Sequence, residues 1–315
     1  MSASAAKRVA ILGSDSSPYV QQIAKCFAQS QLEHRILSWQ QIACCLPAGQ
    51  TSDSTQADST SAPTTLDSFD AVIVRSMPLG SLEQVIFRMD CLHVAQDRGT
   101  LVLNPPRCLE IAIDKWLALH RLQQTELDVP STIACQTRDQ AIEAWRQLGG
   151  DVLVKPIFGG EGRGILRVQD EDSAWRISST LQQLGSVLYL QQFVEHSGYD
   201  IRVLFLGDRA WAVKRYGAAG NWRTNVAQGA RVEPHELSES EHSIALRAIQ
   251  AIGADAKRSF LGVDLLPARD GTTYVLEVNA VPGWKGLARA LNVDIANELT
   301  SWINRELRAR NFYSV

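Results

Sequence analysis

The sequence predicts an α/β unit in the first third of the chain and α+β units in the rest. Up to residue 103, short apolar runs alternate with helical patterns, which is typical of a parallel sheet with helices on its faces. The later strands come in neighbouring pairs, and the last pair flanks a turn at Asp270-Gly271. The length of 315 residues is enough for two or three packed units.

The first unit is expected to span residues 1–108. Its predicted strands lie at 9–12, 34–39, 71–74 and 101–103, and its helical patterns lie at 18–27 and 82–93. The turn GSDSSP after the first strand is compatible with a helix cap at Ser17 or with an anion site. Residues 49–65 are rich in Ser and Thr and carry little to bury, so we expect a flexible surface insertion there.

The second and third units are expected at 109–190 and 191–315. The pattern of Ile113, Trp116, Leu117 and His120 predicts one helix, and Ser238 with Glu241 predicts a capping box for another. Further helices are expected near 142–148 and 295–303. Strands are expected at 152–155, 187–190, 201–206, 211–215, 260–266 and 273–278.

Composition and charge argue against several classes of partner. The chain has 31 basic and 34 acidic side chains, and a net charge of −3 argues against nucleic acid as a partner. No apolar run approaches the roughly 20 residues that span a bilayer, so no membrane partner is expected. The N-terminus lacks the pattern of a signal peptide, and the six cysteines form no CxxC pair. We therefore expect a cytoplasmic protein, and the sequence leaves open whether it forms a homo-oligomer.

Three oxygen-bearing side chains near the C-terminus indicate a metal site. Glu277 and Asn279 share one strand face, and a two-residue turn at Asp270-Gly271 would place Asp264 opposite Glu277. Two carboxylates at such a short distance repel each other unless a cation lies between them. Oxygen ligands suit Mg²⁺ or Mn²⁺ bound together with phosphates. The alternative is the solvated face of a hairpin. Pro267 lies inside the first strand and could shift the register.

A second pattern is typical of phosphate binding. Lys155 ends an apolar strand, and the loop that follows has four glycines in six residues, Gly159, Gly160, Gly162 and Gly164. Such a backbone can wrap closely around a polyphosphate, although it is not a Walker loop. The alternative is a flexible glycine-rich hairpin without a ligand.

Three arginines form a third group, Arg202, Arg215 and Arg223. Arginine binds phosphoryl and carboxylate oxygens in a bidentate manner, so we expect these side chains to act as catalytic cations. Taken singly, each could equally be a surface arginine or a partner in an ion pair.

In this order the three patterns resemble the ATP-grasp superfamily, and in detail its RimK-like branch of alpha-L-glutamate ligases. The similarity runs from about Asp70 to Trp302. It is carried by DKWLALHRL, VLVKPIFGGEGRGI, YLQQFVEHSGYDIRVLFLGD, NWRTNVAQGA and GVDLL…VLEVNAVPGWKGL. The resemblance implies an ATP-grasp fold with an N-terminal pre-ATP-grasp domain built on a Rossmann-like parallel sheet.

The resemblance also implies roles for single residues. Lys115 and Lys155 would contact the nucleotide phosphates, and Asp200 would lie on the ribose side. Arg223 and Asn225 would lie near the phosphates and metals. The adenine hinge would be Gln192, Phe193 and Val194, and the metal ligands would be Asp264, Glu277 and Asn279.

The implied reaction joins a carboxylate to an amine at the expense of ATP, with two divalent ions. The expected substrates are an amino acid, L-glutamate, and a small-molecule carboxylate acceptor. Trp222 and Trp284 could stack on a planar ring, and PGWKGL resembles the tetrahydromethanopterin-type glutamate ligases, which favours a pterin acceptor. Trp284 could equally pack the turn against the last helix. The alternatives are glutamylation of a protein C-terminus, as in ribosomal protein modification, and a non-catalytic ATP-binding regulatory protein.

Overall fold

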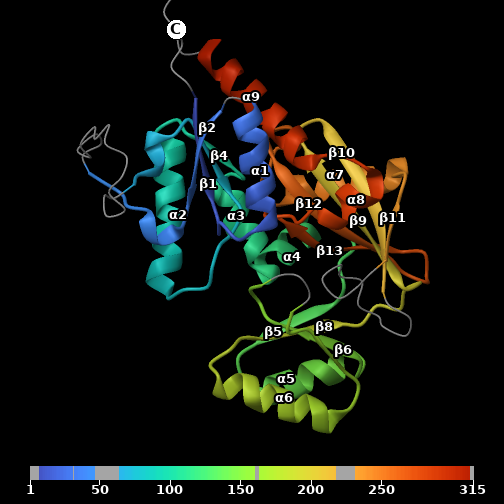
Figure 1. The fold of residues 1–315 in the computed structure, drawn as a ribbon. Coiled ribbons are helices and arrows are strands. Elements are labelled where there is room, and N and C mark those ends of the chain that lie inside the picture. The colour runs from blue at the N-terminus through green and yellow to red at the C-terminus, as the bar shows by residue number, and fades with distance from the viewer. Residues whose placement is uncertain (1–6, 31, 47–63, 160–162, 218–230, 313–315) are drawn as a thin grey trace, which may run out of the picture.

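The computed structural model describes residues 7–30, 32–46, 64–159, 163–217 and 231–312. Within these ranges the strands form one parallel and two antiparallel sheets, each covered by helices (Figure 1). The predicted combination of α/β and α+β architecture is therefore confirmed. Of the Ser/Thr-rich tract, only its last two residues lie within the described residues.

The parallel sheet has the strand order β2-β1-β3-β4. Alternate residues of β1 face opposite sides: Val9 and Ile11 pack with α1, whereas Ala10 and Leu12 pack with α2. The sheet is thus covered on both faces, which explains its continuous apolar strands. The bounds are Arg8–Leu12 for β1, Pro18–Gln29 for α1, Glu33–Leu37 for β2, Ala71–Val74 for β3, Leu82–Asp97 for α2 and Leu101–Leu103 for β4.

The second sheet has the order β5-β8-β6-β7, and α5 and α6 pack on it (Figure 1). Its strands are all antiparallel to their neighbours. The bounds are Thr132–Cys135 for β5, Arg138–Gln147 for α5, Val152–Lys155 for β6, Leu166–Val168 for β7, Glu171–Gln183 for α6 and Leu188–Gln192 for β8. Sequence patterns did not predict β5, β7 or α6, because the two strands are short and α6 is mostly polar.

The third sheet is antiparallel, in the order β11-β10-β9-β12-β13, with α7 packed behind it. The capping box predicted for α7 is confirmed, since the Ser238 hydroxyl accepts from the Glu241 backbone N–H. The bounds are Tyr199–Leu206 for β9, Arg209–Tyr216 for β10, Arg231–Pro234 for β11, Glu239–Ala251 for α7, Phe260–Pro267 for β12 and Thr273–Asn279 for β13.

The single helix predicted around residues 113–120 is wrong. The chain forms α3 (Pro106–Ile113) and α4 (Lys115–Gln124), which are separated at Asp114. The Asp114 carboxylate accepts from the backbone N–H groups of Trp116 and Leu117 at 2.9 and 3.0 Å, so it caps α4. The break places Lys115 at the first position of α4.

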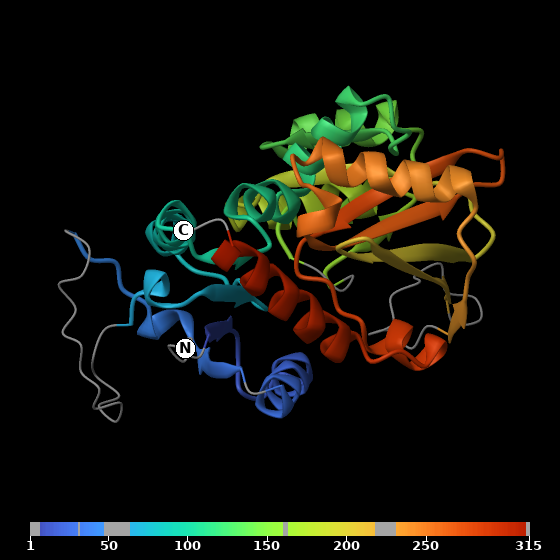
Figure 2. The same cartoon turned by 90° about the horizontal axis from the view of Figure 1, so that it is seen from above.

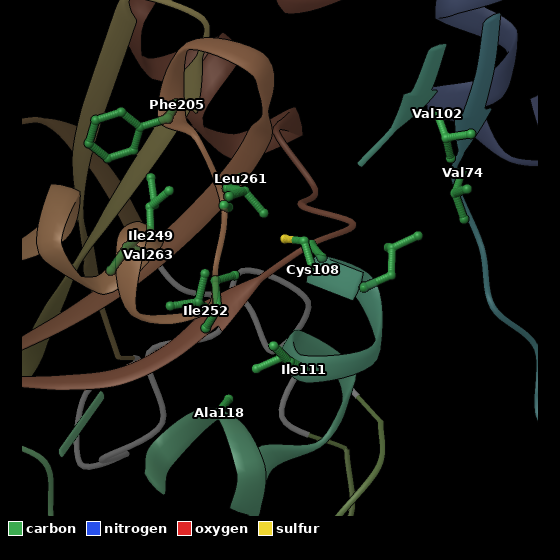
Figure 3. Close-up of a cluster of buried hydrophobic side chains, with 14 of the residues drawn as sticks. Val74, Val102, Cys108, Ile111, Ala118, Phe205, Ile249, Ile252, Leu261 and Val263 are labelled. Carbon is green, nitrogen blue, oxygen red and sulfur yellow. The ribbon is translucent and has the colours of Figure 1, made fainter. Parts of the chain in front are cut away.

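The two helices lie between the parallel sheet and the third sheet. Figure 3 shows Cys108 and Ile111 of α3 between Val74 and Val102 on one side and Ile252 and Leu261 on the other. All six side chains belong to one buried apolar cluster. The parallel unit and the third sheet therefore share a core.

The C-terminal helix packs against the N-terminal unit. After α8 (Lys285–Leu291), the last helix α9 (Ile295–Phe312) packs along α1 beside the parallel sheet (Figure 2). Leu299, Trp302 and Ile303 of α9 are buried in one cluster with Phe27 of α1. No helix of the described residues is both long enough and apolar enough to cross a bilayer.

Replacing Leu299 with alanine is expected to lower the free energy of unfolding by about 2–5 kcal/mol, because it opens a cavity in this cluster. The exposed neighbour Asn297 is the matched control, and Asn297→Ala should change stability by less than about 0.5 kcal/mol. Urea denaturation measures both values. Equal losses for the two variants would contradict the placement of α9.

Candidate active site

A cavity of about 870 Å³, including its open mouth, lies between the two antiparallel sheets. Its walls come from β6, β8, β9, β10, β12 and β13, and from Gly159 and Arg163 of the glycine-rich loop. One part is apolar, with Leu153, Ile165, Leu266 and Leu276. The other part is charged, with Lys115, Lys155, Arg163, Asp200, Arg215, Asp264 and Glu277. A cavity with both kinds of wall suits a small organic anion.

The expected pairing of Asp264 with Glu277 is present, but the turn that produces it is different. Ala268 pairs with Thr272 through the Ala268 N–H, so the turn has three residues, Arg269 to Gly271, and Arg269 does not face Thr272. Gly271 adopts a φ of +90°, which favours glycine. A bulge between Asp264 and Leu265 then shifts the register by one residue. The longer turn and the bulge cancel, so the two carboxylates face each other.

Asp264 is surrounded by arginines. Arg202 forms a bidentate ion pair with its carboxylate, and Arg215 Nη2 lies 2.9 Å from Oδ2. Burial by itself would raise the pKa of Asp264, but the two guanidinium groups dominate and lower it to about 2. Asp264 is therefore ionised and held in place by the protein.

Glu277 is in the opposite situation. Its ion-pair contact to Arg202 is 3.9 Å long, and its side chain is one-third exposed towards the cavity. Burial, and then the negative charge of Asp264, raise the pKa of Glu277. This carboxylate therefore lacks close neutralisation, and a bound cation would supply it.

The arginines expected to act on substrate are bound by acidic residues. Arg215 donates to both oxygens of Asp200 at 2.7 Å, and Arg202 does the same for Asp264. Arg202 does not line the cavity, whereas Arg215 and Asp200 do. The ribose role that the resemblance implies for Asp200 would use oxygens that already accept from Arg215.

Two lysines contribute positive charge to the cavity. Lys155 Nζ donates to the Gln191 side-chain oxygen at 2.5 Å, and burial lowers the pKa of this lysine to about 8. Lys115 Nζ donates to the carbonyl oxygens of Gly159 and Ile157 at 2.6 and 3.5 Å, and burial lowers its pKa as well. Glu277 is close enough to both lysines to oppose these shifts. An anion in the cavity would meet two ammonium groups on one side.

The expected hinge also lines the cavity, through Gln192, Phe193 and Val194. The backbone N–H of Gln192 donates to the Ser131 carbonyl at 2.8 Å, and that of Phe193 donates to the Asp151 carbonyl at 3.0 Å. The edge of a base bound at this wall would therefore form hydrogen bonds with backbone carbonyl groups or with the backbone of Val194. It would not bond to the N–H groups of Gln192 and Phe193.

The remaining expected residues are more scattered. Gly159 lines the cavity, and Gly164 has a φ of +74° beside Pro156. Asn279 ends β13 outside the cavity wall, and its side-chain oxygen accepts from the Val281 N–H at 3.3 Å. Five expected residues lie outside the described residues, namely Gly160, Gly162, Trp222, Arg223 and Asn225.

The expected stacking role of Trp284 is wrong. The indole is 2% exposed, and it packs against Tyr19 at 4.7 Å and Phe260 at 5.5 Å between ring centroids. Its N–H donates to the Gln22 side chain at 3.1 Å. A ring enclosed in this way belongs to the core and presents no face to a substrate.

Two polar residues of the wall were not predicted from the sequence. Gln191 of β8 is 1% exposed, and its side chain joins Lys155 to the Thr132 hydroxyl. In the sequence it stands beside Gln192 at the end of an apolar run, which gives no sign that Gln191 is the buried one of the two. His196 resembles a polar loop residue in the sequence, yet it lines the cavity, and burial lowers its pKa.

The chemistry of these donors fits a divalent cation. Asp264 and Glu277 face each other across paired strands, and Glu277 is the carboxylate that protein charges leave least neutralised. Hard oxygen donors beside two lysines suit Mg²⁺ held jointly with phosphates. Among the described residues no group of three or more His, Cys, Asp or Glu side chains forms a cage, so phosphate oxygens would have to complete the coordination.

Comparison with known proteins finds a matching family model and named relatives. Residues 112–303 match the model of the RimK-like ATP-grasp domain. The tetrahydromethanopterin:alpha-L-glutamate ligase of Methanosarcina acetivorans is 30% identical over 77% of this chain and 82% of its own. A "Probable alpha-L-glutamate ligase" of Haemophilus influenzae is 33% identical over 79% and 81%.

A solved structure shares the fold. The ATP-grasp ligase PsnB, complexed with its minimal precursor, Mg and ADP, superposes with a TM-score of 0.68. The match covers 95% of this chain and 98% of that one at 20% sequence identity. At this identity the likeness establishes the fold alone.

Raising the pH is expected to weaken the binding of ADP, because the Lys155 ammonium loses its proton above a pKa of about 8. The affinity should fall by up to about tenfold per pH unit between about pH 8 and 9.5. Lys155→Arg is the control, since a guanidinium stays charged over this range and should hold its affinity to higher pH. Isothermal titration calorimetry across this range gives both profiles, and parallel profiles would contradict the assignment.

Proposed function

The chain belongs to the RimK-like ATP-grasp family, and from that premise we propose that it joins L-glutamate to a small-molecule carboxylate at the expense of ATP. The observation that carries the proposal is the cavity, whose wall brings two lysines together with two facing carboxylates. The names of the two relatives described above support glutamate as the amino acid.

In this proposal the triphosphate lies along the charged wall. Lys155 and Lys115 attract its oxygens, and Lys115 also binds the carbonyls of Ile157 and Gly159, where the glycine-rich loop begins. The base lies towards Phe193 and the apolar wall. Mg²⁺ held by Asp264 and Glu277, with Asn279 at the end of the same strand, would neutralise phosphate charge when bound.

The proposed reaction needs no covalent enzyme intermediate. The acceptor carboxylate attacks the γ-phosphorus and releases ADP, which gives an acylphosphate. The glutamate amine then attacks the acyl carbon, loses a proton and expels phosphate. The protein holds the reactants in line and stabilises charge on the transferred phosphoryl group through its lysines. Exclusion of water from the cavity protects the acylphosphate.

Ion pairs and hydrogen bonds between the wall residues hold the charged groups of the cavity in place. Asp200 and Asp264 hold Arg215 and Arg202 rigidly, so the arginines set the field of the cavity without having to reorganise during the reaction. Lys155 is oriented by Gln191, which is itself fixed by Thr132. Arg223 and Asn225 stay in the proposal as phosphate contacts from the resemblance alone.

The acceptor we favour is a pterin of the tetrahydromethanopterin type that ends in a carboxylate. Its support is the Methanosarcina acetivorans relative, whose name states that acceptor. Of the two indoles expected to stack on the pterin ring, Trp222 remains the candidate, since Trp284 is enclosed in the core. The test is to incubate the protein with ATP, labelled glutamate and a panel of carboxylate acceptors, and to identify products by mass spectrometry. Label found only on a protein C-terminus would contradict the pterin acceptor, and ATP binding without any product would contradict the ligase.

Replacing Glu277 with glutamine is expected to lower acceptor-dependent ADP release by about 10²–10³-fold, because it removes the carboxylate that a cation needs. Glu277 is a cleaner target than Asp264, whose loss would leave Arg202 and Arg215 as buried charges without that partner. Glu171→Gln, on the exposed face of α6, is the control and should keep full activity. Near-normal ADP release from Glu277→Gln would show that this residue does not hold the metal.

A further inference from the structure

Two polar side chains of the parallel-sheet unit are buried against the strands that carry the carboxylate pair. Asn104 follows β4 and is 2% exposed, and Arg75 follows β3 and is 9% exposed. Both bind backbone that is more than 150 residues away in the sequence. The proposed function assigns neither side chain a role.

Asn104 joins the ends of two strands with one amide. Its Nδ2 donates to the carbonyl oxygens of Phe260 and Ala280, each at 2.6 Å, and its Oδ1 accepts from the Phe260 N–H at 2.7 Å. Phe260 is the first residue of β12, and Ala280 directly follows Asn279, the last residue of β13. The amide thus spans both strands at the end that lies away from their turn.

Arg75 holds the next residues of the same segment. Its Nη2 donates to the Pro282 carbonyl at 2.8 Å, and its guanidinium carbon lies 4.6 Å from the centre of the Trp284 ring. Tyr19 and Phe260 lie at 5.6 and 5.8 Å from it. These aromatic faces stabilise a buried cation in place of a carboxylate.

The position of the bulge explains why such support is needed. The bulge between Asp264 and Leu265 separates the turn from the strand pairs that include Glu277 and Asn279. On the carboxylates' side of the bulge β12 and β13 share only the run from Gly262 with Asn279 to Asp264 with Glu277, and the bulge, which allows local bending and twist, separates this short run from the turn. On the far side of the bulge, Asn104 contacts both strands and Arg75 contacts the segment that follows β13.

We infer that Asn104 is a positioning residue for the metal carboxylates, assisted by Arg75. It fixes β12 against β13 beyond the bulge, and so it fixes the distance between Asp264 and Glu277. The inference rests on the proposed function, since it presumes a cation between these two groups. Through Asn104 and Arg75 the parallel-sheet unit supports the metal site, although this unit contributes no ligand to the metal.

The test compares the Mg²⁺ dependence of ADP binding in full-length variants, followed by intrinsic tryptophan fluorescence. Asn104→Ala should raise the half-saturating Mg²⁺ concentration about tenfold, as loss of supporting hydrogen bonds around metal ligands commonly does. Its affinity for ADP in the presence of a chelator should stay within about twofold of the wild type, because the lysines are untouched.

Thr100→Val is the matched control. Thr100 is 4% exposed in the same unit, and its hydroxyl donates to the Phe69 carbonyl at 2.9 Å, so its loss destabilises the unit without touching β12 or β13. It should lower the melting temperature and leave the Mg²⁺ dependence unchanged. If Asn104→Ala does not fold, Arg75→Lys takes its place, with a smaller shift in the same direction.

The outcomes separate the two claims. A tenfold shift for Asn104→Ala, with none for Thr100→Val, supports the positioning role. Equal Mg²⁺ dependence in both variants overturns it and leaves Asn104 a purely structural residue. A wild-type protein whose ADP binding does not depend on Mg²⁺ would overturn the proposed function instead.

Discussion

The repulsion between two carboxylates that face each other on paired strands is the constraint on which the rest of the site depends. Asp264 and Glu277 lie opposite each other in a largely buried place, where like charges repel strongly. The protein neutralises the first with Arg202 and Arg215 and leaves the second with a raised pKa. This asymmetry keeps one carboxylate fixed and ionised while the other is ready to take up a cation.

The same asymmetry organises the cavity around the pair. Lys155 and Lys115 stand near Glu277 and are held by the Gln191 side chain and by loop carbonyls, none of which carries a charge. Their positive charge is therefore available to an incoming anion, in contrast to the arginines, which acidic residues already bind. A polyphosphate with its cation would complete the charge balance of the cavity, which is the physical basis for assigning ATP-dependent ligation to this chain.

The sequence predicted most of the fold because strand and helix periods are local properties. It also predicted that Asp264 faces Glu277, although through a shorter turn and without the bulge, two errors that cancel. Contacts between residues far apart in the chain could not be predicted from the sequence. In the sequence an indole beside a motif looks the same whether it contacts a ligand or Tyr19, so both roles stayed open for Trp284. The contacts of Asn104 with Phe260 and Ala280 have no local signature either.

The most direct measurement is a crystal structure of the protein with ADP and Mn²⁺, with the metal located by anomalous scattering. The account predicts a metal peak between the carboxylates of Asp264 and Glu277, with Lys155 on the phosphates. A peak bound to other residues, or a nucleotide bound with no metal at these carboxylates, would contradict it.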